Sequence, residues 1–388
     1  MKICFYFQVH QPKRLKRFTI LEFGKNNNLE ELYFDNAKNR AVLERVARKC
    51  YLPTNKLMLQ LIKDYNFKFS LSLTGIFIEQ CREWIPEVID SFKELVDTGN
   101  VELLNETYYH SLASLYENKE EFIEQIKMHK ELMKKEFNYE GKVFRNTELI
   151  YSNEIAKIAE ELGYRAILAE GINLGWRSPN YIYKPPNCLI KTLLRNYLLS
   201  DDISFRFSAY KWEQYPLTAD KYADWLSKCQ GQVLNIFMDY ETFGEHQWQE
   251  TGIFEFLKYL PVALKKYPHL EYSTLNEASQ LPAVGEYDCP NITSWADLER
   301  DTSAWLGNEM QRACFNALKN LESLVKNKKD RKLLHVWRTL QATDPIYYIS
   351  TKRLGDEEVH RYFAEHQSPY DVFISYMNII QHLRLKLS

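Results

Sequence analysis

Short apolar runs rich in β-branched and aromatic residues alternate with longer amphipathic stretches over the first 280 residues. The runs that we expect to form strands are 3–9, 67–73, 101–104, 143–145, 166–169, 189–194, 233–239 and, more weakly, 271–275. Helical patterns lie between several of them, at 76–96, 118–136, 152–162 and 252–265. This alternation is typical of parallel strands joined by crossover helices. With roughly seven such units, it favours a closed or nearly closed α/β barrel over an open sheet.

The strand pattern ends near residue 297, and the rest of the chain has helical patterns. These patterns cover 303–325, 330–344 and 368–387. We therefore expect a barrel over residues 1–285. A C-terminal helical region over residues 286–388 should pack on the mouth of that barrel.

Composition excludes several classes of function. A net charge of −2 and a pI near 6.5 give no electrostatic footprint for nucleic acid or an anionic membrane. Seven scattered cysteines without a CxxC pair argue against a disulfide framework or a structural zinc site. No signal peptide and no stretch near the roughly 20 apolar residues of a membrane span are apparent. We therefore expect a cytoplasmic protein. The sequence has no glycine-rich phosphate-binding motif and no GxSxG elbow, which argues against nucleotide chemistry and a serine-based triad.

Acids and histidines follow nearly every predicted strand. In α/β barrels the reactive side chains stand at the carboxyl-terminal ends of the strands, so these residues should share one rim. They are His10 and Gln11, Glu106 and His110, Glu148, Glu170, Asp239 and Glu241.

Two of these acids also have purely structural explanations. Asn146 or Thr147 is suited to cap a helix with Glu148 near its start. However, Ser152 begins a better helix start, which leaves Glu148 in the loop between strand and helix. Asp239 ends a buried run and is equally consistent with a structural hydrogen-bonded acid or with a side chain aimed into the barrel mouth.

Two carboxylates on separate strands suit glycoside chemistry, in which one attacks the anomeric carbon and the other protonates the leaving oxygen. Aromatic residues make up 14% of the chain, and rings in the loops suit the C–H face of a sugar. The candidate rings are Trp176, Phe243, Trp248, Trp295 and Trp305.

A zinc-like site is the alternative for the same rim. His10, His110, Asp239 and His246 carry suitable ligand atoms. They lie in distant segments, and neither HExxH nor HxH occurs. We expect no metal and no other cofactor.

Five motifs occur in order along the chain. They are "VHQP", "VELLNETYYHSL", "FRNTELIY", "MDYETFGEHQW" and "SWADLERDTSAWLGN". Together they resemble the five-region pattern of glycoside hydrolase family 57, and in particular its compact α-amylase-type branch. One departure is Asn105, where a small residue would be expected before Glu106.

The resemblance implies a (β/α)7-type incomplete TIM barrel followed by a helical subdomain, and a retaining mechanism on α-1,4-glucans. By matched motif, Glu148 corresponds to the nucleophile and Asp239 to the general acid/base. The substrate-binding residues that we predict are His10, Gln11, Glu106, His110, Trp176, Glu241, Phe243, His246, Trp248, Asp301 and Trp305. Glu241 would act as a supporting acid that tunes Asp239.

Other functions remain open at this point. A 4-α-glucanotransferase would use the same chemistry with a second glucan in place of water. A catalytically weak glucan-binding protein and a metal-dependent sugar deacetylase are more distant alternatives. The expected partner is an α-glucan rather than nucleic acid or membrane, and the sequence does not determine the oligomeric state.

Overall fold

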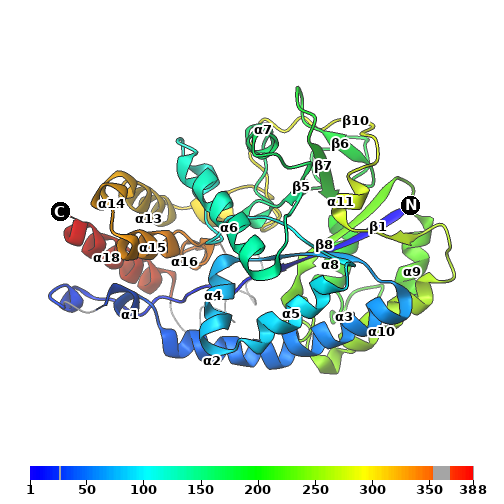
Figure 1. Cartoon of the computed structure of the whole chain (residues 1–388), viewed down its shortest axis with the longest axis horizontal. Helices are drawn as coiled ribbons and strands as arrows, with labels where there is room; N and C mark the ends of the chain where they lie inside the picture. The colour runs from blue at the N-terminus through cyan, green and yellow to red at the C-terminus, as the bar shows by residue number, and fades with distance from the viewer. Residues whose placement is uncertain (26–27, 353–367, 388) are drawn as a thin grey trace.

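The computed structural model describes residues 1–25, 28–352 and 368–387 (Figure 1). In this part of the chain, seven parallel strands surround a common interior. They are β1 Lys2–Val9, β2 Phe69–Leu73, β3 Val101–Leu103, β4 Val143–Phe144, β5 Ala166–Glu170, β7 Lys191–Arg195 and β8 Val233–Asp239. Regular ladders join them in the orders β3-β2-β1-β8 and β7-β5-β4.

Two short backbone contacts join the two sheets into a ring. A single parallel bridge between Asn105 and Phe144 connects the end of β3 to β4. Between β7 and β8, the Asn196 amide donates to the Asn235 carbonyl oxygen at 2.9 Å. The predicted (β/α)7-type incomplete TIM barrel is thereby confirmed.

Three further strands lie outside the ring of seven. β6 Ile182–Lys184 runs antiparallel to β7, and β10 Gly285–Glu286 pairs with β6. β9 Glu271–Tyr272 pairs with the start of β1. The strand predicted at 271–275 is therefore real but short, whereas β6 was not predicted.

Alternation along β1 and β8 explains how the site is built. In β1, Cys4 and Tyr6 join the interior cluster of the barrel, whereas Phe5 and Phe7 join the outer cluster. β8 alternates in the same way, with Phe237 inside and Ile236 outside. Because side chains alternate with period two, Gln8 and Asp239 fall on the inner face. These two residues are paired neighbours at the carboxyl-terminal end of the ladder.

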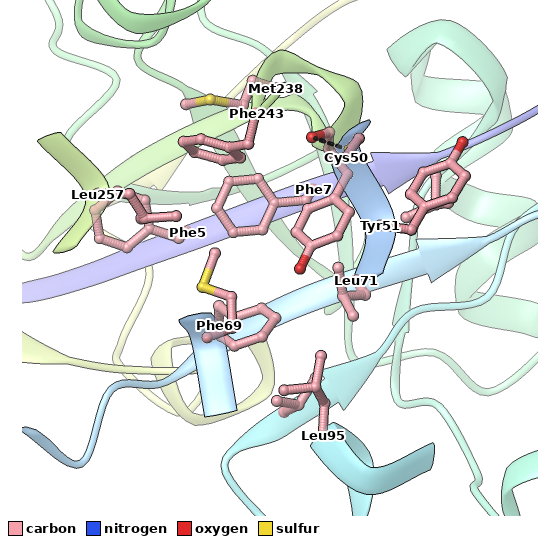
Figure 2. Packing of buried hydrophobic residues seen from close by; sticks show 14 of the residues in the cluster. Phe5, Phe7, Cys50, Tyr51, Phe69, Leu71, Leu95, Met238, Phe243 and Leu257 are labelled. Atoms are coloured by element: carbon pink, nitrogen blue, oxygen red, sulfur yellow. Dashed lines mark hydrogen bonds between the residues drawn. The ribbon is translucent and has the colours of Figure 1, made fainter. Parts of the chain in front are cut away.

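Phenylalanines fill the space between the barrel and one layer of helices (Figure 2). The ring of Phe7 lies 5.8 Å from Phe69 and 5.6 Å from Phe243, measured between centroids. The covering helices are α2 Asn36–Val46, α3 Leu52–Tyr65, α4 Gly75–Trp84, α5 Glu87–Asp97, α9 Ala219–Lys228 and α10 Ile253–Leu264.

The pattern at 76–96 predicted one helix, and the structure has two. Pro86 separates α4 from α5. Proline lacks an amide hydrogen and disfavours the helical conformation of the residue before it, and Ile85 accordingly has a φ of −152°. The predicted single helix is therefore wrong at this point.

The opposite side of the barrel is covered by α6 Glu120–Phe137 and α7 Asn153–Glu161. The Ser152 hydroxyl accepts a hydrogen bond from the Ile155 amide at 3.3 Å and caps α7, as the sequence predicted. The short helices α8 Tyr197–Ser204 and α11 Leu275–Ala278 complete the barrel half.

Helices dominate the rest of the described chain, as predicted. They are α12 Ser303–Leu306, α13 Glu309–Lys319, α14 Glu322–Lys328, α15 Arg331–Leu340, α16 Thr343–Tyr347 and α18 Pro369–Leu387. Figure 1 shows most of them gathered at the end of the molecule away from the N-terminus. Arg338 of α15 ties this region to α6 through paired bonds of 2.8 and 3.0 Å to Glu121. The boundary at residue 285/286 stays a prediction.

The segment between β1 and α2 packs with these C-terminal helices, which the sequence did not predict. It includes α1 Leu29–Tyr33, which lies beside α18 in Figure 1. The Tyr33 hydroxyl contacts His382 Nδ1 of α18 at 2.7 Å. The Phe18 amide donates to the Ser375 hydroxyl of the same helix at 3.4 Å. Among the described residues, no helix combines the length and apolarity needed to cross a membrane.

Candidate active site

A cavity of about 220 Å³ opens at the carboxyl-terminal ends of the barrel strands. Strand ends and the C-terminal helices both contribute to its wall. Its titratable and aromatic side chains include His10, His110, Glu148, Arg195, Phe205, Asp239, Glu241, His246, Trp295, Asp297, Arg300, Trp305, Asp344, Tyr347 and Tyr348.

Glu148 lies in a single 3-10 turn, Thr147–Leu149, between β4 and α7. Its φ of 55° is uncommon for a residue with a side chain. Its Oε1 atom contacts His110 Nε2 at 3.0 Å and accepts from the Thr343 hydroxyl at 3.3 Å. Its Oε2 atom accepts a hydrogen bond from Trp295 Nε1 at 2.6 Å. Both carboxylate oxygens are therefore held in place.

The segment after the barrel also holds the backbone of Glu148. The Ser294 hydroxyl and the Trp295 amide both donate to the Glu148 carbonyl oxygen, at 2.7 and 3.2 Å. Nearby, Tyr151 and Thr293 form an antiparallel bridge with two backbone hydrogen bonds of 2.9 Å. These contacts offset the cost of the positive φ, which is on the order of 1–3 kcal/mol.

His110 bridges two carboxylates. Its Nδ1 atom lies 3.3 Å from Glu106 Oε2, and its Nε2 atom lies 3.0 Å from Glu148 Oε1. Burial acts to lower the pKa of His110, but the hydrogen bonds to Glu106 and Glu148 raise it to about 9. The imidazole is therefore a cation at neutral pH and donates from both nitrogens.

Glu106 lies behind His110 and is fully buried. It accepts a hydrogen bond from Gln8 Nε2 at 3.1 Å and lies 3.8 Å from the Arg145 guanidinium. Burial acts to raise the pKa of Glu106, but His110 and Arg145 lower it to about 2. The permanent negative charge of Glu106 thus keeps His110 protonated.

The carboxyl group of Glu148 is also held ionised. Burial acts to raise its pKa, but the hydrogen bond and charge of His110 outweigh that effect. Together with Arg145 and Trp295, they lower the pKa of Glu148 to about 2. Glu148 therefore presents a negatively charged oxygen pair to the cavity throughout the neutral range.

Asp239 is the last residue of β8 and faces the same cavity. Burial, together with the negative charge of Glu148, raises the pKa of Asp239 to about 6. Asp239 keeps its proton in weakly acidic solution, where Glu148 is fully ionised. Two carboxyl groups whose pKa values are pushed apart in one cavity suit a pair that acts as nucleophile and acid.

Glu241 stands two residues further on and lines the cavity. Its Oε1 atom accepts a hydrogen bond from the Tyr51 hydroxyl at 2.5 Å and from the His10 amide at 3.4 Å. Burial, together with the charge of Asp239, raises the pKa of Glu241 to about 8. Glu241 is therefore a neutral acid in the range where Asp239 titrates.

His10 lies in the first motif and stacks on His110. The ring centroids are 4.1 Å apart, with 24° between the planes. Its Nδ1 atom contacts the Thr74 hydroxyl at 3.0 Å, and its Nε2 atom contacts Asp344 Oδ2 at 3.1 Å. Burial, together with the nearby charge of His110, lowers the pKa of His10. One neutral imidazole and one charged imidazole thus lie face to face.

A buried ionic network contacts both the backbone and the ring of Trp295. Arg195 contacts Glu170 at 3.0 Å and Asp201 at 2.5 Å. Arg300 contacts the same two acids at 3.2 and 3.1 Å, and also donates to the Trp295 carbonyl oxygen. The Arg195 guanidinium lies 5.6 Å from the Trp295 ring. The network therefore places the indole opposite Glu148.

Most of the predicted site residues lie around this cavity. His10, Gln11, His110, Glu148, Asp239, Glu241, His246 and Trp305 line it. Burial lowers the pKa of His246 to about 4. Trp305 is buried, with its ring centroid 6.4 Å from that of Tyr347.

The structure does not bring the other predicted substrate-binding residues to the cavity lining. Phe243 is a core residue beside Phe7 and Met238 (Figure 2), because its loop folds back under the strand end. Trp176 is 95% exposed, and Trp248 lies on the surface beside Lys49. Asp301 is exposed and accepts a hydrogen bond from the Ser303 amide, which starts α12. Glu106 acts from behind His110.

Sequence reasoning missed several residues of the site. Arg145 directly follows β4, so its position at a strand end could have placed a cation near the site. Thr343 and Asp344 lie in a helical region with no local motif. The sequence predicts Trp295 only as a stacking ring, whereas in the structure its indole N–H donates a hydrogen bond to Glu148.

A metal centre finds no support in the geometry. No three His, Cys, Asp or Glu side chains in the described ranges are grouped so as to hold a metal ion. The expectation that catalysis needs no metal stays a prediction, which chelator treatment of the active protein tests.

Solved structures share this fold. A GH57 branching enzyme from Thermococcus kodakaraensis aligns with a TM-score of 0.70 at 14% identity, covering 99% of this chain and 95% of that one. A 4-alpha-glucanotransferase from Thermococcus litoralis aligns with a TM-score of 0.66 at 16% identity. That alignment covers 89% of this chain but only 56% of the longer glucanotransferase.

Sequence comparison is more specific. A protein of Methanocaldococcus jannaschii named "Putative alpha-amylase" is 52% identical over 394 residues, covering 98% of this chain and 83% of that protein. The sequence profile of glycosyl hydrolase family 57 matches residues 4–290. A match over most of the chain establishes membership: this protein belongs to glycosyl hydrolase family 57.

Proposed function

We propose that this protein is a retaining glycoside hydrolase of the α-amylase type that cleaves α-1,4-glucosidic bonds in maltodextrins or starch-like glucans. Glu148 is the nucleophile and Asp239 is the general acid/base. One observation carries the proposal: Glu148, with a lowered pKa, and Asp239, with a raised pKa, line the same cavity. The name of the Methanocaldococcus jannaschii relative supports the choice of substrate.

In the first step, Asp239 gives its proton to the glycosidic oxygen while a Glu148 carboxylate oxygen attacks the anomeric carbon. The bond to the leaving glucan breaks, and a glycosyl ester of Glu148 forms. Asp239 then takes a proton from water, and the resulting hydroxide displaces Glu148. The two inversions retain the configuration of the sugar.

His110 and Trp295 support the nucleophile in both steps. Their hydrogen bonds to Oε1 and Oε2 hold the carboxylate in one orientation. The charge of His110 also makes Glu148 a better leaving group when the ester is hydrolysed, because it stabilises the carboxylate that is released.

Aromatic rings around the cavity suit a glucan. Phe205, Trp295, Trp305 and Tyr347 all line the wall, and flat rings stack against the C–H faces of sugars. Polar groups such as Asp297, Asp344 and Arg300 supply partners for sugar hydroxyls. A pocket with apolar surfaces and a few placed polar groups is typical of small-ligand sites.

A 4-α-glucanotransferase would use the same two carboxyl groups, with the 4-hydroxyl of a second glucan in place of water. Incubation with maltoheptaose and separation of the products distinguishes the two. Shorter sugars alone support hydrolysis, whereas shorter and longer sugars together indicate transfer. No change at any enzyme concentration would refute both and leave a glucan-binding protein.

Two variants test the assigned roles. Glu148→Gln keeps the shape and removes the nucleophile, so turnover should fall by several orders of magnitude with glucan binding retained. Asp239→Asn should also be nearly inactive, with partial rescue by azide on an aryl glucoside that has a good leaving group. Glu255→Gln and Asp64→Asn, at exposed positions of α10 and α3, are matched controls. Near-normal hydrolysis by Glu148→Gln would refute the mechanism.

A further inference from the structure

The first two residues of helix α16, Thr343 and Asp344, line the candidate site. This helix belongs to the C-terminal helical region. Ser111 and Ala342 form an antiparallel bridge, and the Thr343 amide donates to the His110 carbonyl oxygen at 3.0 Å. The Leu112 amide donates to the Gln341 carbonyl oxygen at 3.3 Å. Backbone hydrogen bonds thus fix the position of α16 relative to the loop that carries His110. These α16 residues lie outside the range 4–290 that the family profile matches.

Thr343 contacts the nucleophile directly. Its hydroxyl donates to Glu148 Oε1 at 3.3 Å, the oxygen that His110 also contacts. Thr343 is 2% exposed, so its hydroxyl has little access to bulk water. Loss of this hydroxyl would leave His110 as the sole protein donor to Oε1 among the described contacts.

Asp344 contacts the other side of the histidine stack. Its Oδ2 atom lies 3.1 Å from His10 Nε2, and the Thr74 hydroxyl lies 3.0 Å from His10 Nδ1. An ionised carboxylate only accepts hydrogen bonds, so Nε2 must carry the proton of a neutral His10. The Thr74 hydroxyl then donates to Nδ1. Asp344 therefore selects one tautomer of His10.

The charge of His10 matters because its ring stacks on that of His110, with the centroids 4.1 Å apart. The charged and titratable groups around this stack are Glu106, Glu148, Arg145, Asp344 and the two histidines. A second proton on His10 would place two cations face to face. With His10 neutral, Asp344 instead adds negative charge near His110, which favours its protonated form.

We propose that Thr343 and Asp344 are positioning residues for the reaction of Glu148, and that α16 completes the site. Thr343 orients the nucleophile through Oε1, and Asp344 orients His10 and, through it, the His110 ring. This inference rests on the proposed function, in which Glu148 is the nucleophile. It assigns a role in the reaction to a helix of the C-terminal region.

Thr343→Val replaces the hydroxyl with a methyl group of similar size. We expect kcat on maltoheptaose to fall about tenfold, as for one hydrogen bond to a charged group, while KM changes less than about twofold. Thr343→Ser should restore kcat to within about threefold. Thr339→Val, which removes a buried hydroxyl of α15 that donates to the His335 carbonyl oxygen at 2.8 Å, is the matched control. Equal kcat values for Thr343→Val and Thr339→Val would overturn the role of Thr343.

Asp344→Asn is tested by NMR of ¹⁵N-labelled histidine, which needs no turnover. In the wild type, His10 should be the Nε2–H tautomer. Asp344→Asn removes the charged acceptor of Nε2–H and the negative charge near His110, so the share of the Nδ1–H tautomer of His10 should rise and the titration midpoint of His110 should fall. Asp330→Asn, at the cap of α15, is the matched control. An unchanged tautomer and midpoint would overturn the role of Asp344.

The two measurements separate this inference from the proposed function. A wild-type chain that cleaves no α-glucan would refute the proposed function, whereas the NMR result would still decide whether Asp344 holds the histidine stack. If Asp344→Asn failed to fold, Thr343→Val and its serine rescue would decide the inference by themselves.

Discussion

The indole Nε1 of Trp295 donates a hydrogen bond of 2.6 Å to Glu148 Oε2, across 147 positions of the chain. The ring of Trp295 is flanked by Arg145 at 5.0 Å and by Arg195 at 5.6 Å. Trp295, which the sequence predicts as a sugar-stacking ring, therefore helps to keep Glu148 ionised and oriented.

Trp295→Phe removes the N–H group and keeps an aromatic ring for the two arginines. The lost hydrogen bond to a charged group is worth about 1.5–3 kcal/mol, so kcat should fall roughly 10- to 100-fold. The pKa of Glu148 should rise, which moves the acidic limb of kcat/KM to higher pH. A pH–rate profile measures this shift. Trp84→Phe, on helix α4 in the outer layer, is the control, and an unmoved acidic limb in Trp295→Phe would contradict the assignment.

The alkaline limb of kcat/KM should have a midpoint near pH 6, because the proposed general acid, Asp239, must be protonated and its pKa is raised to about 6. Glu241 is raised to about 8 and stays neutral through that range. Glu241→Gln should therefore leave the midpoint within about half a pH unit. A shift of more than about one unit to lower pH would restore the tuning role that the sequence suggested for Glu241.

His110 should make the protein more stable at neutral than at alkaline pH. Its folded pKa of about 9 lies above its ordinary value of 6.5, so its contribution is complete below pH 6.5 and is lost as the pH rises through 9. The shift corresponds to about 3 kcal/mol at most. Urea unfolding of the wild type and His110→Gln should show a difference in free energy that shrinks over this window. A constant difference would contradict a charged His110.

Phe205 is half exposed and lines the cavity, and the Ser204 carbonyl oxygen next to it is held by Gln247 Nε2 at 3.0 Å. Phe205→Ala should raise KM for maltoheptaose about 3- to 10-fold with little change in kcat, because an apolar contact surface is lost. Steady-state kinetics would show this. Tyr259→Ala, at a similarly exposed ring on α10, should leave KM unchanged. An unchanged KM in Phe205→Ala would exclude Phe205 from glucan binding.

The sequence by itself determined the strand–helix alternation of the barrel and placed Glu148 and Asp239 directly after two of its strands. A buried apolar run is a short-range property, and the run at 233–238 predicted that Asp239 ends a strand. The structure then showed that its side chain faces the cavity, since successive side chains of a strand point to opposite faces. The cap at Ser152 is equally local, and it left Glu148 in the loop before α7. The prediction of one helix at 76–96 was wrong because the apolar spacing continues across Pro86, whereas the backbone before a proline leaves the helical conformation.

Only the tertiary structure decided the environment of those acids. Burial and charge, which set the protonation states of Glu148 and Asp239, come from groups far apart in sequence. Asp344 meets His10 across 334 positions, and no local pattern encodes that contact. The same holds for Phe243, whose ring follows the strand into the core rather than into the cavity. Residue type and spacing report short-range geometry, whereas a pKa depends on every charge within a few ångströms, and that distance is defined only once the chain has folded.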